Sequence, residues 1–142
     1  MRTKAVTATA VIISMLALTA PAANATPPRG VTGTIIGRTT VDGKDYVLRE
    51  ITLAPGGSTG WHYHEGTLYG RVRGGTLTHN KSDCSLDGIY EQGTPIVEQP
   101  GQGNVHIGRN LGTTPVVLDV LYVLPEGAPL AVDAPNPGCD FS

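Results

Sequence analysis

Beyond its first 25 residues, the chain lacks several features that whole classes of protein require. After Gly30, no segment longer than a few residues repeats its apolar positions with the 3.6-residue period of an amphipathic helix, which excludes a helical bundle. Basic residues are few: removing Arg2 and Lys4 from the ten Lys and Arg leaves eight against twelve Asp and Glu, a net charge of −4 for Thr26–Ser142. With no basic patch, nucleic acid is not expected as a partner.

The first 25 residues have the pattern of a secretory signal peptide. Arg2 and Lys4 form a short positive region, Ala5–Ala20 is apolar, and the small residues at 23–25 (ANA) supply a cleavage site. Retention as a membrane anchor is the alternative, but a spanning helix needs about 20 apolar residues, and this run is shorter and contains Ser and Thr. We expect cleavage after Ala25, a secreted, extracellular or cell-envelope location, and no membrane contact afterwards.

Cysteine is scarce as well, with only Cys84 and Cys139 in the chain. An exported chain meets oxidising conditions, under which two cysteines usually pair, so we predict a disulfide between them. A thiolate metal ligand or nucleophile is the alternative. The disulfide would tie the Pro-rich tail, residues 128–142, to the rest of the domain.

Short β-prone runs separated by Gly, Pro, Asp and Asn fill the rest of the chain and predict an all-β domain over residues 31–127, after a linker at 26–30. Asp42-Gly43 and Gly74-Gly75 both suit tight hairpins, because glycine accepts a positive φ. The tail is expected to lack regular structure. The predicted strands are Val31–Thr40, Asp45–Leu53, Thr59–His64, Leu68–Arg73, Thr76–Asn80, Gly88–Glu91, Pro95–Glu98, Asn104–Gly108 and Pro115–Leu124. Nine short strands in one domain predict a sandwich or a barrel.

Three histidines have a spacing that suits metal binding. His62 and His64 are two residues apart, so a strand places both on one face, about 6.5–7 Å apart along the chain. His106 follows a second Gly-rich turn, and we expect the two units to face each other across a small barrel. Three imidazoles can bind one divalent ion. The alternative is three ordinary histidines in a β-domain that binds no ion.

The glycines around these histidines carry a family resemblance. Gly56, five further residues, His62-x-His64 and Gly75 resemble the first motif of the cupin superfamily, and Gly103-x-x-His106-x-x-x-Asn110 resembles the second. The chain looks like the small secreted single-domain cupins of actinobacteria. The resemblance implies a jelly-roll barrel, a metal site made of His62, His64 and His106, and a homodimer as a candidate assembly.

The usual cupin glutamate is missing from the first motif, because Leu68 stands at its position. Glu65 follows His64 directly, so strand alternation turns it to the other face unless a bulge intervenes. Glu98 is the other candidate for a fourth ligand. The expected site is therefore three imidazoles, which suit iron, zinc, nickel or copper better than manganese.

Other polar residues near these motifs have no expected role in binding an ion. His79 lies outside both motifs and is not expected to be a ligand. Trp61 should face away from His62 and pack, Arg71 and Arg73 should be exposed, and Asn110 should bind backbone in a turn.

Three functions fit these observations. The first is a secreted metal-binding cupin that holds a small polar or anionic ligand at a three-histidine centre inside the barrel. The second is a metal-dependent cupin enzyme of the dioxygenase or isomerase type. The third is a metal-free module that binds a ligand or partner. The sequence shows no nucleophile beside a base, so no reaction can be assigned.

Overall fold

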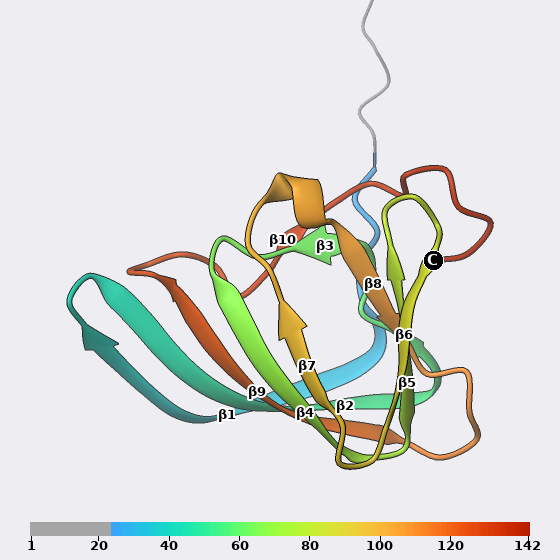
Figure 1. The fold of residues 1–142 in the computed structure, drawn as a ribbon, viewed down its shortest axis with the longest axis horizontal. Helices are drawn as coiled ribbons and strands as arrows, with labels where there is room; N and C mark the ends of the chain where they lie inside the picture. Colours follow the sequence, from blue (N-terminus) through green and yellow to red (C-terminus); the bar gives the residue numbers. More distant parts are fainter. Residues whose placement is uncertain (1–23) are drawn as a thin grey trace, which may run out of the picture.

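The computed structural model describes residues 24–142, and this part of the chain folds into a nearly closed β-barrel (Figure 1). The all-β prediction is therefore confirmed. Residues 1–23, most of the predicted signal peptide, lie outside the described part, and no helix within that part is long and apolar enough to cross a membrane. The elements are β1 (Arg29–Val41), β2 (Lys44–Ser58), β3 (His62–Tyr63), β4 (Thr67–Gly74), β5 (Thr76–Lys81), β6 (Leu86–Glu91), β7 (Pro95–Glu98), the short 3-10 helix η1 (Gln102–Asn104), β8 (His106–Arg109), β9 (Val116–Pro125) and β10 (Val132–Asp133).

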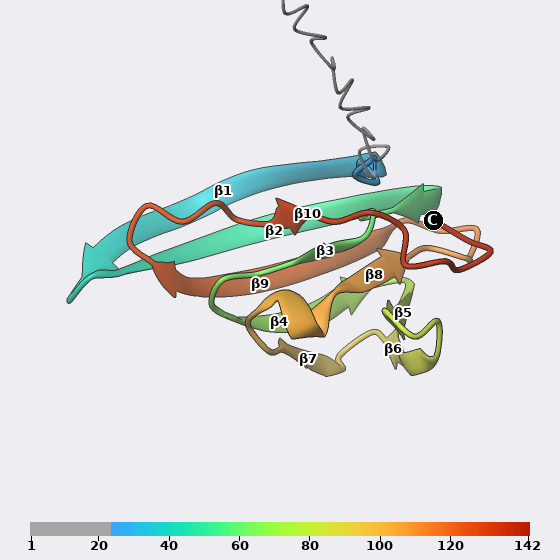
Figure 2. The ribbon, with the colours of Figure 1, turned by 90° about the horizontal axis from the view of Figure 1, so that it is seen from above.

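Strand pairing divides the barrel into two layers. One layer has the order β1-β2-β9-β4-β7, and the other has the order β10-β3-β8-β5-β6. The layers join where Ser58 at the end of β2 pairs with Arg109 of β8. The β1–β2 hairpin extends beyond the rest of the barrel (Figures 1 and 2).

The long pair β2–β9 forms the middle of the first layer, with an unbroken antiparallel register from Lys44↔Pro125 to Leu53↔Val116. Burial alternates along β9 with a period of two, because successive side chains point to opposite faces of a sheet. The five inward side chains of β9 are Val116, Leu118, Val120, Tyr122 and Leu124, and all five belong to the main hydrophobic core.

The two predicted hairpin turns have different outcomes. Asp42 and Gly43 both have positive φ, 50° and 71°, and connect β1 to β2 as a tight hairpin, as predicted. The prediction for Gly74-Gly75 is wrong: β4 pairs with β7 and β9, whereas β5 pairs with β6 and β8. Gly75, with φ 73°, lets the chain turn a corner between the two layers past the carbonyl of Pro115.

The tail is attached to the barrel more extensively than predicted. Cys84 and Cys139 form the expected disulfide, with a Cα–Cα distance of 5.5 Å. The prediction that the tail lacks regular structure is wrong at β10, which pairs with β3 through Val132↔Tyr63 and Asp133↔His62. Trp61 is fully buried, and its ring stacks on that of Phe141 in the tail, with ring centroids 5.9 Å apart. The tail thus covers the strand that carries His62.

Candidate metal centre

Two neighbouring strands of one layer bring the three histidines together. His62 of β3 and His106 of β8 are direct partners in the antiparallel register, with ring centroids 4.4 Å apart. The ring of His64 lies 4.8 Å from that of His62 and 5.3 Å from that of His106. The predicted clustering is confirmed, but the expectation that the two units face each other across the barrel is wrong. They lie side by side, because β3 and β8 pair directly.

Backbone carbonyls orient all three imidazole rings. His62 Nδ1 lies 2.9 Å from the Gly60 carbonyl oxygen, His64 Nδ1 lies 2.6 Å from that of Leu130, and His106 Nδ1 lies 2.8 Å from that of Asn104. A carbonyl only accepts, so each Nδ1 must carry the hydrogen that it donates. In the neutral rings, Nε2 then has a lone pair free for a metal ion.

The fourth member of the cluster is Glu98, at the end of β7. Its Oε2 lies 3.1 Å from His64 Nε2 and 3.3 Å from His106 Nε2. One donor atom from each of His62, His64, His106 and Glu98 can be chosen so that all four lie within 4.8 Å of one another. Opposite ligands on one ion with bonds of about 2.1 Å are about 4.2 Å apart, so small side-chain rotations would bring all four donors onto one ion.

The strand register explains how Glu98 reaches the site. In the β4–β7 pair, Leu68 is the direct partner of Glu98, so their side chains project from the same face. Leu68 stands where the first motif would supply a glutamate, and the structure places a carboxylate on the next strand, opposite that position. Glu65, the other candidate, is exposed and lies outside the cluster, in the bend between β3 and β4.

The expected site of three imidazoles alone is therefore incomplete. Sequence reasoning named Glu98 only as an alternative, because the register of β7 against β4 cannot be read from either segment by itself. The expectation against manganese depended on the absence of a carboxylate, and the presence of Glu98 removes that argument.

The buried charges of the cluster interact strongly. Burial would raise the pKa of Glu98, but the close imidazoles of His106, His64 and His79 hold it well below its usual value. Burial would lower the pKa of His106, but the carboxylate of Glu98, 3.3 Å from its Nε2, outweighs burial and raises it. Burial, together with the charges of His106 and His64, lowers the pKa of His62 to about 3. Without an ion, His106 and Glu98 therefore stabilise each other's charged forms.

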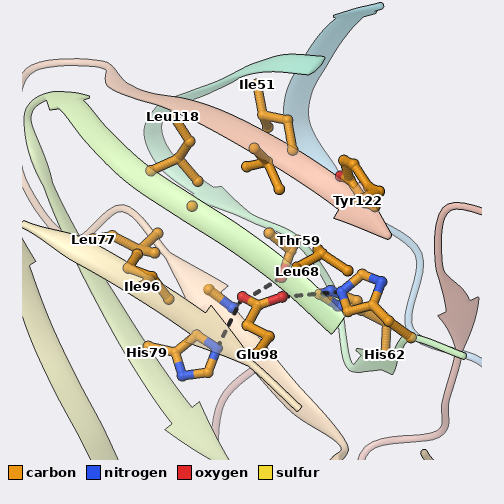
Figure 3. Close-up of a pocket in the computed structure, with 14 residues that line it drawn as sticks. Ile51, Thr59, His62, Leu68, Leu77, His79, Ile96, Glu98, Leu118 and Tyr122 are labelled. Atoms are coloured by element: carbon orange, nitrogen blue, oxygen red, sulfur yellow. Dashed lines mark hydrogen bonds and ion pairs between the residues drawn. The ribbon is translucent and has the colours of Figure 1, made fainter. Parts of the chain in front are cut away.

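His79 is a site residue that sequence reasoning missed. It is buried on β5, where its Nδ1 lies 3.0 Å from Asp87 Oδ2. Its Nε2 lies 3.5 Å from Glu98 Oε1 (Figure 3). Tyr90 donates a hydrogen bond to the same Asp87 oxygen, at 3.1 Å. His79 is outside the four-residue cluster, so it remains a neighbour of the carboxylate rather than a candidate ligand. Its place two residues after the buried Leu77 is the signal that would have revealed its inward orientation.

A small cavity lies inside the barrel beside the cluster (Figure 3). Its volume is about 50 Å³, enough for a few water molecules or one small chemical group. His62, His64, His79 and Glu98 form one end, and apolar side chains form most of the rest. Those apolar residues include Ile51, Leu68, Leu77, Ile96, Leu118 and Val120.

The remaining sequence predictions concern residues that support the site. Arg71 and Arg73 are exposed, as predicted, and Arg73 pairs with Asp119 at 3.3 Å. Asn110 is buried and donates to the carbonyls of Leu53 and Thr114, which confirms its role as a backbone-binding turn residue.

The pKa of His62 gives a prediction for the metal-free protein. Its folded pKa of about 3 lies below the ordinary 6.5, so between these values the unfolded chain binds a proton that the folded chain does not. The free energy of unfolding should therefore fall as the pH is lowered from about 6.5 towards 4, by up to about 1 kcal/mol per pH unit. The lowered pKa of Glu98 likewise makes the free energy of unfolding fall with falling pH, at lower pH values. The raised pKa of His106 stabilises the fold below pH 6.5, and this stabilisation is lost as the pH rises.

Urea denaturation of chelator-treated protein at several pH values measures this slope. His62→Gln removes the titrating group and should flatten the slope over the same range. An equal slope for both proteins would show that His62 is not held neutral.

Comparisons with known proteins support the fold. No protein-family model matches the chain, and no curated protein sequence matches it. Solved structures do match. The Cupin_2 domain of an XRE family transcriptional regulator from Enterobacter cloacae has a TM-score of 0.57 and 20% identity, covering 69% of this chain and 100% of that one. The polyketide cyclase RemF from Streptomyces resistomycificus has a TM-score of 0.60 and 18% identity, covering 87% of this chain and 90% of that one.

A third similar structure is KdgF from Halomonas sp., with a TM-score of 0.54 and 18% identity over 68% of this chain and 82% of that one. The protein therefore has the cupin fold, a jelly-roll barrel. At these identities the likeness concerns the fold, and the function has to be argued from the site.

Proposed function

We propose that the protein is a secreted metal-binding cupin that holds one divalent transition metal ion on His62, His64, His106 and Glu98 and binds a small polar or anionic ligand beside it. The observation that carries this proposal is the meeting of two Nε2 atoms with one carboxylate oxygen inside the barrel.

The chemistry of these contacts favours an ion. With Nδ1 donating to a carbonyl, the neutral rings of His64 and His106 have no hydrogen on Nε2 to offer Glu98. Within residues 24–142, both Nε2 atoms are buried without a hydrogen-bond partner. Lone pairs that face a carboxylate repel it, and either a shared proton or a bound cation between them removes that repulsion. A metal ion would satisfy all of these atoms at once.

Three imidazoles and one carboxylate suit iron, zinc, nickel or copper, and they are compatible with manganese. The ion would supply a Lewis acid with open coordination positions. The chain's own residues set the rest of the site: the three carbonyls hold the rings, and His79, whose Nδ1 contacts Asp87, lies beside the outer oxygen of Glu98. The apolar walls of the cavity favour a ligand that is small and only partly polar.

Secretion is supported by two features. The pattern of residues 1–25 is that of a signal peptide, and the Cys84–Cys139 disulfide fits an oxidising compartment.

A metal-dependent enzyme of the dioxygenase or isomerase type is the second candidate. The observation that favours it is the apolar cavity next to the cluster, since a site shielded from water strengthens electrostatic interactions with a substrate. Oxygen consumption by the iron-loaded protein with a panel of thiols and diketones would distinguish an oxygenase from a binding protein.

Zinc titration tests the metal site directly. Chelator-treated protein should take up one Zn²⁺ per chain, and saturation at about a hundredfold excess over the dissociation constant should raise the free energy of unfolding by about 3 kcal/mol. Elemental analysis gives the stoichiometry, and urea denaturation gives the stabilisation. The absence of both uptake and stabilisation would contradict the proposed function and favour the metal-free module.

A further inference from the structure

An arginine occupies the inward-facing row of β2. One face of this strand carries Val47, Arg49 and Ile51. The register places Arg49 directly opposite Val120 of β9. Val120 and Ile51 line the cavity beside the metal centre. Arg49 therefore belongs to the face that builds the barrel interior, although its side chain is charged.

Gly33 of β1 makes room for this arginine. In the β1–β2 register, Gly33 pairs with Ile51 and Ile35 pairs with Arg49, so Gly33 is diagonal to Arg49 on the same face. A Cβ atom built on Gly33 would overlap the guanidinium of Arg49, and its nearest neighbours are all atoms of that side chain. The guanidinium thus lies flat against the glycine backbone, in space that any other residue would fill.

The charge of Arg49 has no internal partner. Over the described range 24–142, the ion pairs of arginine involve Arg38 and Arg73, and none involves Arg49. Its side chain is only partly exposed. Holding an arginine at an inward position without a carboxylate costs free energy, which an anionic ligand would offset.

A second cavity of about 170 Å³ connects Arg49 with the metal centre. Its lining includes Arg49, Tyr122, His62 and His64. All of these except Arg49 also line the inner cavity. Asp133 is the carboxylate at this mouth, but it is exposed, so solvent screens its charge. One continuous space therefore runs from the arginine to the histidines.

We propose that Arg49, for which Gly33 leaves room, is the anion-binding residue of this site, and that the ligand is a small carboxylate held in the cavity that Arg49 and Tyr122 both line. The planar guanidinium can hold a carboxylate with two parallel hydrogen bonds, which a neutral ligand cannot provide. The short body of the ligand lies among the apolar side chains of the inner cavity. This inference rests on the proposed function for the other end of the ligand, which faces the metal ion.

Calorimetric titration of butyrate into zinc-loaded and chelator-treated protein tests the inference. Butyrate should bind the zinc-loaded protein, and the affinity should fall by at least about tenfold in Arg49→Gln, because the charge-assisted hydrogen bonds are lost. Gly33→Ala should cause a similar loss, because its methyl group displaces the guanidinium while the charge is retained. Arg71→Gln, at an exposed position of β4, is the matched control and should bind like the unmodified protein. Butyramide, the neutral analogue, should bind equally to all four proteins.

Each alternative result has a defined meaning. Absence of butyrate binding, or equal binding by the unmodified protein and Arg49→Gln, would overturn the inference. Tighter Arg49-dependent binding of inorganic phosphate than of butyrate would overturn the assignment to carboxylates. If Arg49→Gln fails to fold, Gly33→Ala decides. If zinc is taken up but butyrate binding does not depend on Arg49, the proposed function stands and this inference fails. If butyrate binding depends on Arg49 but zinc is not taken up, the anion site is supported and the metal site is contradicted.

Discussion

Replacing Glu98 with alanine is expected to weaken the binding of zinc more than about a hundredfold. The substitution removes the one anionic donor of the cluster and leaves three neutral imidazoles to hold a doubly charged ion inside the barrel. Loss of groups that only orient a metal ligand costs about 10–100-fold in affinity, so loss of a direct ligand should exceed that range. Competition with a chromogenic chelator at pH 7 measures the dissociation constant.

Glu65→Ala provides the matched control for this experiment. It also removes one glutamate, from a position adjacent to His64, but its side chain is exposed and outside the cluster. Its affinity for zinc should equal that of the unmodified protein. An unchanged affinity in Glu98→Ala, or a large loss in Glu65→Ala, would show that the carboxylate has been assigned to the wrong residue.

Removing the disulfide should have the largest effect on stability. Cys84 and Cys139 are 55 residues apart, and a cross-link closing a loop of this length stabilises a fold by about 4 kcal/mol in the chain-entropy model. A domain of this size has a free energy of unfolding of about 5–15 kcal/mol, so Cys84→Ser/Cys139→Ser should lose a substantial part of it. Urea denaturation of the double variant and the oxidised protein gives the difference.

The same double variant should also bind zinc more weakly. The tail that the disulfide fixes contains Leu130, whose carbonyl oxygen orients His64.

For the stability prediction, denaturation of the chemically reduced protein is the control, because reduction breaks the same bond without changing a residue. If the oxidised, reduced and mutated proteins unfold at the same urea concentration, the disulfide contributes nothing to stability.

The fold could be predicted largely from local pattern. Alternation in segments such as Val116–Leu124 fixes which side chains point inward, and Asp42-Gly43 specifies its own turn. The failure at Gly74-Gly75 has a physical cause. A glycine pair indicates that the chain turns, but the pairing with distant strands determines whether the turn closes a hairpin or joins two layers.

The same distinction explains which site residues could be found in the sequence. His64 lies two residues after His62, immediately beyond the end of β3, so their spacing alone indicates that they lie close together. Glu98 and Arg49 reach the site through the registers of β7 against β4 and of β2 against β1 and β9. Those registers depend on the packing of the whole barrel. Within its own segment, Arg49 looks like a solvated charge, and Glu98 could be named only as an alternative ligand.

The pairing of Leu68 with Glu98 has a consequence for how such centres are recognised. The two positions are 30 residues apart in the chain but adjacent in the sheet, so a carboxylate borne by either one projects towards the same histidines. A motif defined by counting along the chain treats Leu68 as the loss of a ligand, and it would class this protein with degenerate sites. A motif defined by the strand pair would retain it. In this barrel, the carboxylate ligand is defined by its position in the sheet, and a residue on either of the two paired strands can occupy that position.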